Sequence, residues 1–206
     1  MPTRLKKFLL EGGLFLGGLA AATAITGGTT FLGDIIRKAR VEHAMHLSLE
    51  EAMEAQEKEL GIQYSSKPSL STFSPFTNSQ SSGEYHPWSS CILLRIDYPS
   101  DPRFKSPLER MRLTLDHELG HFYTDIVCQK LGIPYPSSTF TGRQLSEGIA
   151  DYFMTRMHPE IFLHTERGCE YGTEHDLYCG GYWRVKPFLD EMGVEKGVEH
   201  LLTRQK

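Results

Sequence analysis

The sequence predicts a mostly helical α+β fold, in which one compact domain holds a small sheet beside a long helix and a second helix follows. Three observations support this prediction. Residues 109–131 and 144–157 each carry helix start and stop signals around an amphipathic pattern. Residues 91–97 are the clearest strand candidate. The 206 residues, 23.4 kDa in mass, suffice for a single domain with a substantial hydrophobic core.

The overall composition excludes several classes of protein. With 39% hydrophobic and 23% charged residues, the chain fits neither a disordered protein nor a polytopic membrane protein. The formal net charge is −4, so nucleic acid is not an expected partner. The 4 cysteines are too few for a disulfide-built scaffold, and none form a CxxC pair for a structural zinc site. Cys169 and Cys179 could close a loop in an oxidising compartment, or all the thiols could be unpaired.

The N-terminal segment is predicted to be separate from the folded domain. Residues 12–32 carry no charge and reach the roughly 20 residues that a transmembrane helix needs, which allows membrane association. A basic start and a small-x-small site at 22–24 are also typical of a cleaved signal peptide. We therefore predict an anchor or signal segment at 1–33 and a folded domain at 34–206, in a protein that is membrane-anchored by a single span or secreted. A Gly- and Ala-rich segment of a soluble protein is the alternative.

The elements before the long helix are predicted from composition and turn signals. Residues 34–60 are rich in helix formers, and Gly61 follows them where a left-handed residue would end a helix. The segment 65–90 is rich in Ser, Pro, Thr and Asn, and we expect an irregular connection of the kind that often borders a functional cleft. The strand at 91–97 comes next.

The long helix at 109–131 carries the most specific motif of the chain. It follows Pro107 and ends before a glycine and a proline. At 3.6 residues per turn, His117, Glu118 and His121 share a polar face. The opposite stripe is apolar and consists of Leu115, Leu119, Phe122 and Ile126. This stripe is expected to pack on the core, so that the polar face borders a cleft.

His117, Glu118 and His121 form the motif HExxH. Two imidazoles one helical turn apart can bind one zinc ion through a ring nitrogen each. The carboxylate beside the first histidine stays free to take a proton from a water that the metal activates. The sequence therefore predicts Zn²⁺ as the cofactor, His117 and His121 as two of its ligands and Glu118 as a general base.

A catalytic zinc site usually has three protein ligands, so a third must come from elsewhere. The metzincin extension would place a histidine at position 127, which is a valine. Asp125 lies on the histidine face but continues the same helix a turn beyond the pair, which makes convergence on one ion difficult. Asp125 is therefore the second choice.

The next predicted helix, at 144–157, supplies the first choice. Thr141 and Gln144 are spaced as a capping box at its start. Glu147 and Asp151 lie one turn apart on the face opposite an apolar stripe. We predict that Glu147 is the third metal ligand and that Asp151 accepts the second ring N–H of the first histidine. A solvated acidic face is the alternative for Glu147.

With these residues placed, the chain resembles the gluzincin metallopeptidases, which join HExxH on one helix with a glutamate on the next. The resemblance covers residues 109–193. It implies a zincin-like domain in which His117, His121 and Glu147 bind zinc, Glu118 is the general base, and the acidic residue four positions after the glutamate orients a histidine.

Two branches of these enzymes share finer features with the chain. Residues 147–152 are similar to the EGxAxY of aminopeptidase-N-like enzymes and bacterial collagenases, and HELGH with ExxAD is similar to membrane-embedded prenyl-protein proteases. Tyr178 begins a segment similar to the aminopeptidase-N YxxG, which implies a hydrogen bond to the tetrahedral intermediate; Tyr182 or His175 could serve instead. The chain lacks the GxMEN segment and extra domains of aminopeptidase N and the several spans of the prenyl-protein proteases.

The predicted function is zinc-dependent hydrolysis of peptide bonds in a peptide or protein substrate, with Glu118 passing a proton to the leaving nitrogen. A tyrosine or histidine from a loop at 171–182 would support the oxyanion, and the strand at 93–97 would pair with the substrate through its edge. One alternative is an inactive, zinc-containing, membrane-tethered binding module. Another is a histidine pair that serves a hydrogen-bond network without a metal.

Overall fold

The computed structural model describes residues 46–73, 82–95, 107–160 and 174–204. The chain divides into two units, Met1–Ala44 and Met45–Lys206, and all described residues belong to the second. The predicted anchor or signal segment lies outside the described residues, so its boundary stays a prediction. Among the helices of the described part, none combines the length and the apolar character that a membrane span requires.

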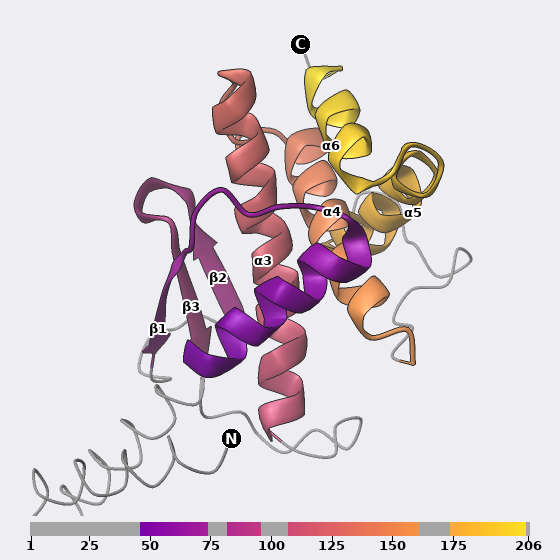
Figure 1. Cartoon of the computed structure of the whole chain (residues 1–206). Coiled ribbons are helices and arrows are strands. Elements are labelled where there is room, and N and C mark those ends of the chain that lie inside the picture. The colour runs from indigo at the N-terminus through magenta and orange to yellow at the C-terminus, as the bar shows by residue number, and fades with distance from the viewer. Residues whose placement is uncertain (1–45, 74–81, 96–106, 161–173, 205–206) are drawn as a thin grey trace, which may run out of the picture. The chain divides into compact units, whose positions relative to one another are not determined.

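The described residues form a mostly helical α+β fold with a small sheet, which confirms the predicted fold class (Figure 1). A helix at 46–60 comes first. The elements that follow are β1 (Ser69–Phe73), β2 (Gly83–His86), the short 3₁₀ helix η1 (Pro87–Ser89), β3 (Cys91–Arg95), α3 (Pro107–Leu131), α4 (Phe140–Met157), α5 (Glu174–Met192) and α6 (Val194–Thr203).

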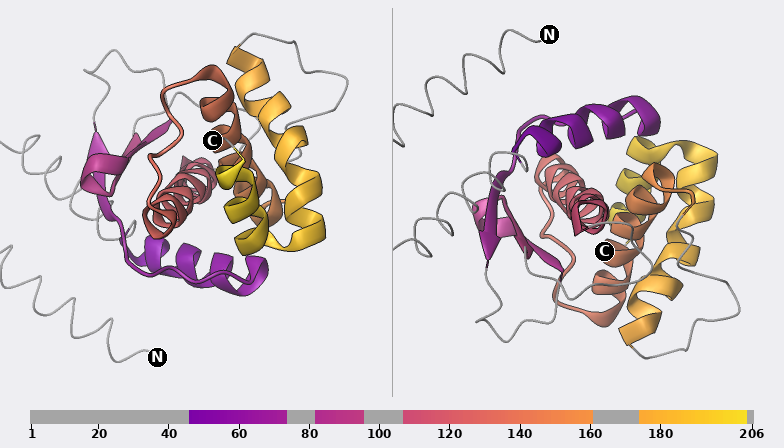
Figure 2. Two further views of the ribbon diagram at one scale, coloured as in Figure 1. Left: turned by 90° about the horizontal axis from the view of Figure 1, so that it is seen from above. Right: turned by 90° about the horizontal axis from the view of Figure 1, so that it is seen from below.

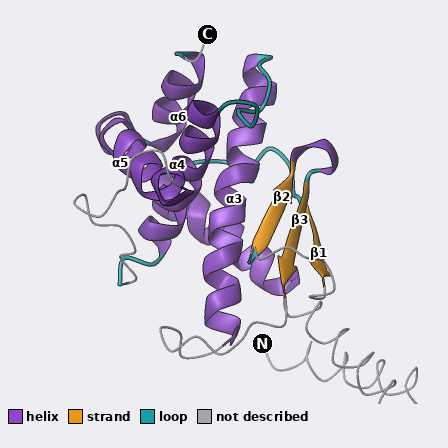
Figure 3. Ribbon diagram, turned by 180° about the vertical axis from the view of Figure 1, so that it is seen from behind, coloured by secondary structure: helices purple, strands orange, loops and turns teal. Residues whose placement is uncertain are grey.

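The long helix α3 lies at the centre of this unit. The sheet packs on one side of it, through β2 and β3, and α4 and α6 pack on the other (Figures 2 and 3). Its predicted apolar stripe is largely buried, with Leu115, Leu119 and Phe122 at most 2% exposed. Gly61, at a φ of 65°, ends the helix at 46–60 as the predicted left-handed residue, and Gly132 follows α3 in the same conformation at 64°.

Several polar side chains of α3 are buried as well, which the sequence did not predict. Asp116 is 1% exposed. Gln56, from the helix at 46–60, donates to one of its carboxylate oxygens over 2.7 Å, and His158 lies 2.7 Å from the other. Thr124 is fully buried and donates to the Gly120 carbonyl of its own helix. Asp116 and Thr124 thus have hydrogen-bond partners, which offset the free-energy cost of burying them.

Close helix contacts at glycines place α4 between α3 and α5. A Cβ atom on Gly120 of α3 would lie 2.6 Å from the Ala150 Cα of α4, and one on Gly148 of α4 would lie 2.3 Å from the carbonyl carbon of Gly181 in α5. Both distances are too short for any side chain, so only glycine permits these backbones to approach so closely. Gly148 and Gly181 belong to the EGIADY and YCGG segments, and in the structure they serve helix packing.

The sheet corrects two predictions. Residues 65–90 were expected to be irregular, but they contain β1 and β2, and the strand order β1-β3-β2 puts β3 in the middle. β1 pairs with β3 in parallel and β2 pairs with it antiparallel. Because both edges of β3 are occupied, the predicted pairing of a substrate with the edge of this strand is wrong. The β3 strand itself ends at Arg95, and residues 96–97 lie outside the described part.

Helix α4 also begins earlier than predicted, and part of a predicted loop is helical. Helix α4 starts at Phe140, and Thr139 caps it by accepting a hydrogen bond from the Gly142 N–H, so the predicted capping box at 141 and 144 is wrong. Residues 174–182, expected to be part of a loop, are the first turns of α5. Cys179 is disulfide-bonded, and Cys91 and Cys128 are free. Cys169, the candidate partner of Cys179, lies outside the described residues.

Candidate metal centre

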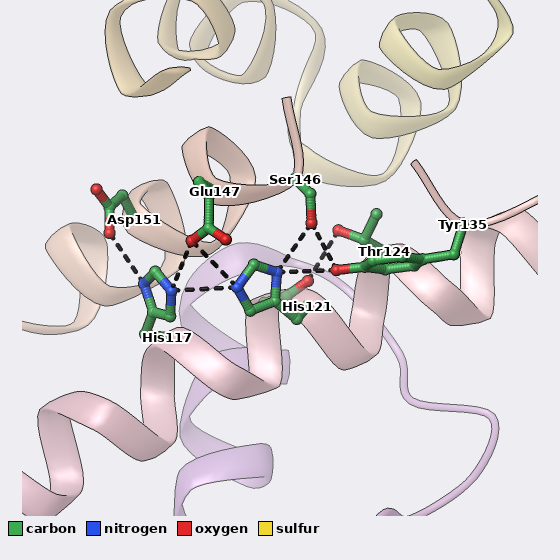
Figure 4. A network of polar contacts seen from close by, with 8 residues as sticks. His117, His121, Thr124, Tyr135, Ser146, Glu147 and Asp151 are labelled. Carbon is green, nitrogen blue, oxygen red and sulfur yellow. Dashed lines mark hydrogen bonds and ion pairs between the residues drawn. The ribbon is translucent and has the colours of Figure 1, made fainter. Parts of the chain in front are cut away.

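Three side chains from α3 and α4 converge on one point (Figure 4). The Nε2 atoms of His117 and His121 are 3.2 Å apart. One carboxylate oxygen of Glu147 lies 3.3 Å from the first of these nitrogens and 3.4 Å from the second. The predicted ligand set is thus brought together, and it is a group of side chains that could hold a metal ion.

The three distances fit a tetrahedral ion better than a hydrogen-bonded cluster. A zinc ion with bonds of about 2.0–2.1 Å keeps neighbouring ligand atoms about 3.3–3.4 Å apart. The observed separations of 3.2, 3.3 and 3.4 Å are close to this value on all three sides. Protons on the two Nε2 atoms could both be donated to the Glu147 oxygen, but the two nitrogens would then face one another without a hydrogen bond. A single ion would contact all three atoms and leave a fourth position for a small ligand.

The two histidines are held by different partners on their far sides. The Nδ1 atom of His117 lies 2.9 Å from a carboxylate oxygen of Asp151, which is 3% exposed and one turn beyond Glu147 on α4. This is the contact that the sequence predicted for Asp151. A histidine that presents Nε2 to a metal carries its proton on Nδ1, so the carboxylate fixes both the tautomer and the ring orientation.

Two hydroxyl groups, which the sequence analysis missed, stand behind the other histidine. The Nδ1 atom of His121 lies 2.9 Å from the Ser146 Oγ and 2.9 Å from the Tyr135 hydroxyl, and these two oxygens are 2.5 Å apart. Ser146 precedes Glu147 on α4, and Tyr135 lies in the connection between α3 and α4. Ser146 adjoins a predicted ligand, which is a weak signal, whereas nothing in the sequence pattern points to Tyr135.

The electrostatics of the centre favour a positive charge at the point of convergence. Burial opposes ionisation of His117, but hydrogen bonds to Asp151 and Glu147 raise its pKa well above the usual value. Burial would also raise the pKa of Glu147, but the adjacent His121 and His117 outweigh this effect and hold the pKa far below its usual range. A cation at this point would therefore lie against the ionised carboxylate of Glu147.

Glu118 lies beside the ligands but is not one of them. Its side chain is only 4% exposed and lies under Gly83 of β2, where a Cβ atom would be 3.0 Å from a Glu118 carboxylate oxygen. Glycine at this position therefore allows the strand to lie directly over the carboxylate. Burial raises the pKa of Glu118 above the usual value, although the neighbouring histidines counteract part of this effect.

A pocket of about 340 Å³ opens above these residues. The centre forms its floor with Glu118, while β2 forms one wall, the connection 135–137 and Arg143 another, and Tyr178 lies at the end nearer His117. The ring centroids of Tyr178 and His117 are 6.2 Å apart, and Tyr178 is 40% exposed. The predicted ligands, the predicted general base and the predicted oxyanion donor thus line one pocket.

The alternative candidates lie elsewhere. Asp125, the second choice for the third ligand, accepts hydrogen bonds from Tyr85 over 2.6 Å and Gln129 over 3.1 Å and is absent from the metal-binding group. Tyr182, an alternative oxyanion donor, is 4% exposed and belongs to the hydrophobic core between the helices. The side chain of His175 lies outside the described part of the molecule.

Comparisons with known proteins find no match: no family model, no curated protein and no solved structure is significantly similar to the chain. The resemblance to gluzincins therefore rests on the motif residues and on the geometry of the centre.

Proposed function

We propose that the protein is a zinc-dependent metallopeptidase of the gluzincin type. The observation that carries the proposal is the convergence of the His117, His121 and Glu147 ligand atoms at 3.2–3.4 Å from one another, with a buried carboxylate beside them at the floor of a pocket. Two imidazoles and a carboxylate are the donor set of hydrolytic zinc sites, which keep one position open.

In this proposal the protein groups divide the work of peptide hydrolysis. The zinc ion, when bound, supplies a Lewis acid that polarises the peptide carbonyl and lowers the pKa of a water molecule to about 7. Glu118 accepts the proton of the attacking water and delivers it to the nitrogen of the leaving amine. Tyr178, at the rim of the pocket, donates a hydrogen bond to the oxyanion as it forms. Asp151 keeps His117 in the tautomer that presents Nε2.

Strand β2 offers the substrate a backbone to pair with. It is the end strand in the order β1-β3-β2. The Arg95 N–H donates to the Ser82 carbonyl, which makes these residues a hydrogen-bonded pair of the antiparallel ladder. Such pairs alternate, so the N–H and C=O groups of Gly83 and Tyr85 point away from β3. An extended peptide that adds to this edge would cross the pocket above Glu118.

The charges of the pocket suggest a preference for a carboxylate on the substrate. Arg143, an exposed residue in the first turn of α4, is the one Lys or Arg among the described residues that line the pocket. Glu84, which also lines the pocket from β2, lies 3.5 Å from His86. We propose that Arg143 binds a carboxylate of the substrate, either an acidic side chain or a free C-terminus.

Exchange of the charge at this position should therefore reverse the preference. The wild type should cleave a peptide with Asp or Glu, or with a free C-terminus, about 5-fold better than the matched amide, since a single screened pair contributes on the order of 1 kcal/mol. Arg143→Glu should prefer Lys at the same substrate position. The measurement is kcat/KM over the peptide series, with Arg184→Glu as a control outside the pocket. An unchanged preference in Arg143→Glu would rule out this role.

The proposed function is tested by metal content and chelation. The purified protein should hold about one equivalent of zinc and should cut members of a peptide library. A chelator should abolish cleavage, and added zinc should restore it. Zinc without any cleavage would instead identify the inactive binding module, and protein that binds no metal would support the metal-free hydrogen-bond network.

A further inference from the structure

We propose that Tyr135 and Ser146 form a hydroxyl pair that positions His121 for metal binding. The hydroxyl oxygens both lie 2.9 Å from His121 Nδ1 and are 2.5 Å from one another. Figure 4 shows the pair on the side of the imidazole that faces away from Glu147. The proposal rests on metal binding at this centre and does not require that the centre hydrolyse peptides.

The hydrogen-bond chemistry of the ring requires such an acceptor. The Nε2 atom of His121 faces His117 and Glu147, so a metal ligand at this atom must carry its proton on Nδ1. His121 is only 7% exposed, and a buried N–H without an acceptor costs about 1–3 kcal/mol. Either hydroxyl oxygen can accept from Nδ1, and the short contact between the oxygens is a hydroxyl–hydroxyl bond.

The two hydroxyls come from different parts of the fold, so the pair holds the ring from two directions. Ser146 is 3% exposed and is fixed by α4, one residue before Glu147. Tyr135 lies between two prolines in the connection from α3 to α4, where Pro136 is buried. Its ring lies 6.3 Å from that of Tyr85 on β2. Loss of one hydroxyl therefore leaves an acceptor in place, whereas loss of both leaves none.

The pair also makes the two metal-binding histidines chemically different. Asp151 is a carboxylate and increases the electron density of His117 through its hydrogen bond, whereas a hydroxyl pair orients His121 without adding a charge. The centre then has one histidine backed by a charge and one backed by neutral groups. A second carboxylate behind His121 would add negative charge to a site that already contains Glu147 and Glu118.

The test compares zinc affinity across single and double variants. Ser146→Ala and Tyr135→Phe should each weaken zinc binding a few-fold, and the double variant should weaken it about 10- to 100-fold, the usual effect of losing the partner of a metal-bound histidine. Tyr85→Phe is the matched control, because it also removes a tyrosine hydroxyl from the lining of this pocket. That hydroxyl donates to Asp125 and not to a histidine. This variant should leave zinc affinity unchanged. The affinity is measured by competition with a chromophoric chelator.

A second readout separates positioning from a loss of stability. The absorption spectrum of the Co²⁺-substituted protein reports ligand geometry, so it should shift in the double variant and stay unchanged in Tyr85→Phe. The melting temperature of each metal-free variant shows whether the fold survives. If the double variant fails to fold, the zinc affinity and cobalt spectrum of Tyr135→Phe alone test the proposal. Zinc affinity and cobalt spectra equal to those of Tyr85→Phe would overturn the proposal. A hydroxyl-dependent zinc affinity without any peptide cleavage would support it and would reject only the peptidase function.

Discussion

Glu118→Gln should lower kcat for peptide hydrolysis by about 10²- to 10⁴-fold, the usual contribution of general acid–base catalysis. The amide has nearly the same size as the carboxylate and fits beneath Gly83, but it cannot accept a proton from the attacking water. Because Glu118 is not among the three converging ligands, zinc content and melting temperature should stay near the wild-type values. Steady-state kinetics on a cleaved library peptide, together with metal analysis, check this prediction.

The control for this experiment is Glu84→Gln. Glu84 also presents a carboxylate to the pocket, but from β2, where it lies near His86. Its substitution should affect KM at most, because this carboxylate does not stand beside the metal ligands. Equal losses in both variants would indicate a general electrostatic effect of the pocket, and full activity in Glu118→Gln would remove Glu118 from the mechanism.

Gly148→Ala should lower the free energy of unfolding by about 3 kcal/mol, near the upper end for an overpacked core. The added Cβ would lie 2.3 Å from the backbone carbonyl of Gly181, so relief requires α4 and α5 to move apart. At an exposed helix position the same change would stabilise by about 1 kcal/mol through helix propensity, so a loss of stability isolates the clash. Chemical denaturation with a two-state fit provides the measurement.

The same variant should also weaken metal binding, because Gly148 follows Glu147 directly and a shift of α4 moves the third ligand away from the histidines. Thr141→Ala, at an exposed position in the first turn of α4, is the control and should change neither stability nor zinc affinity measurably. A Gly148→Ala protein as stable as Thr141→Ala would show that the helices can separate at no cost, which would contradict the packing inferred for this contact.

The sequence was most informative where chemistry depends on spacing within one helix. His117, Glu118 and His121 share a helix, and 3.6 residues per turn fix their relative directions whatever packs around them. The same local rule placed Glu147 and Asp151 on one face of the next helix. The prediction that both carboxylates face the histidine pair therefore needed only one further assumption, that the two helices pack together.

The errors arose where a partner distant in the chain decides the structure. The composition of 65–90 suggests a loop, but pairing with β3 and packing on α3 turn two of its short segments into strands. Asp125 lies on the face of the helix where a ligand would be expected, yet its carboxylate accepts a hydrogen bond from the Tyr85 hydroxyl. No sequence pattern indicates Tyr135. It lies in a connection between helices, which has no regular period from which the direction of a side chain could be predicted.

The sequence by itself determined which side chains form the candidate metal centre and that they stand in pairs on two helices, because helical geometry is local. Only the tertiary structure decided how closely those helices approach, which strand lies over Glu118, and which hydroxyls stand behind His121. These features depend on contacts such as that of Gly120 with Ala150, where the absence of a side chain sets the distance between two backbones. Such distances are fixed by packing between segments that are far apart in the chain, so no local stretch of sequence predicts them.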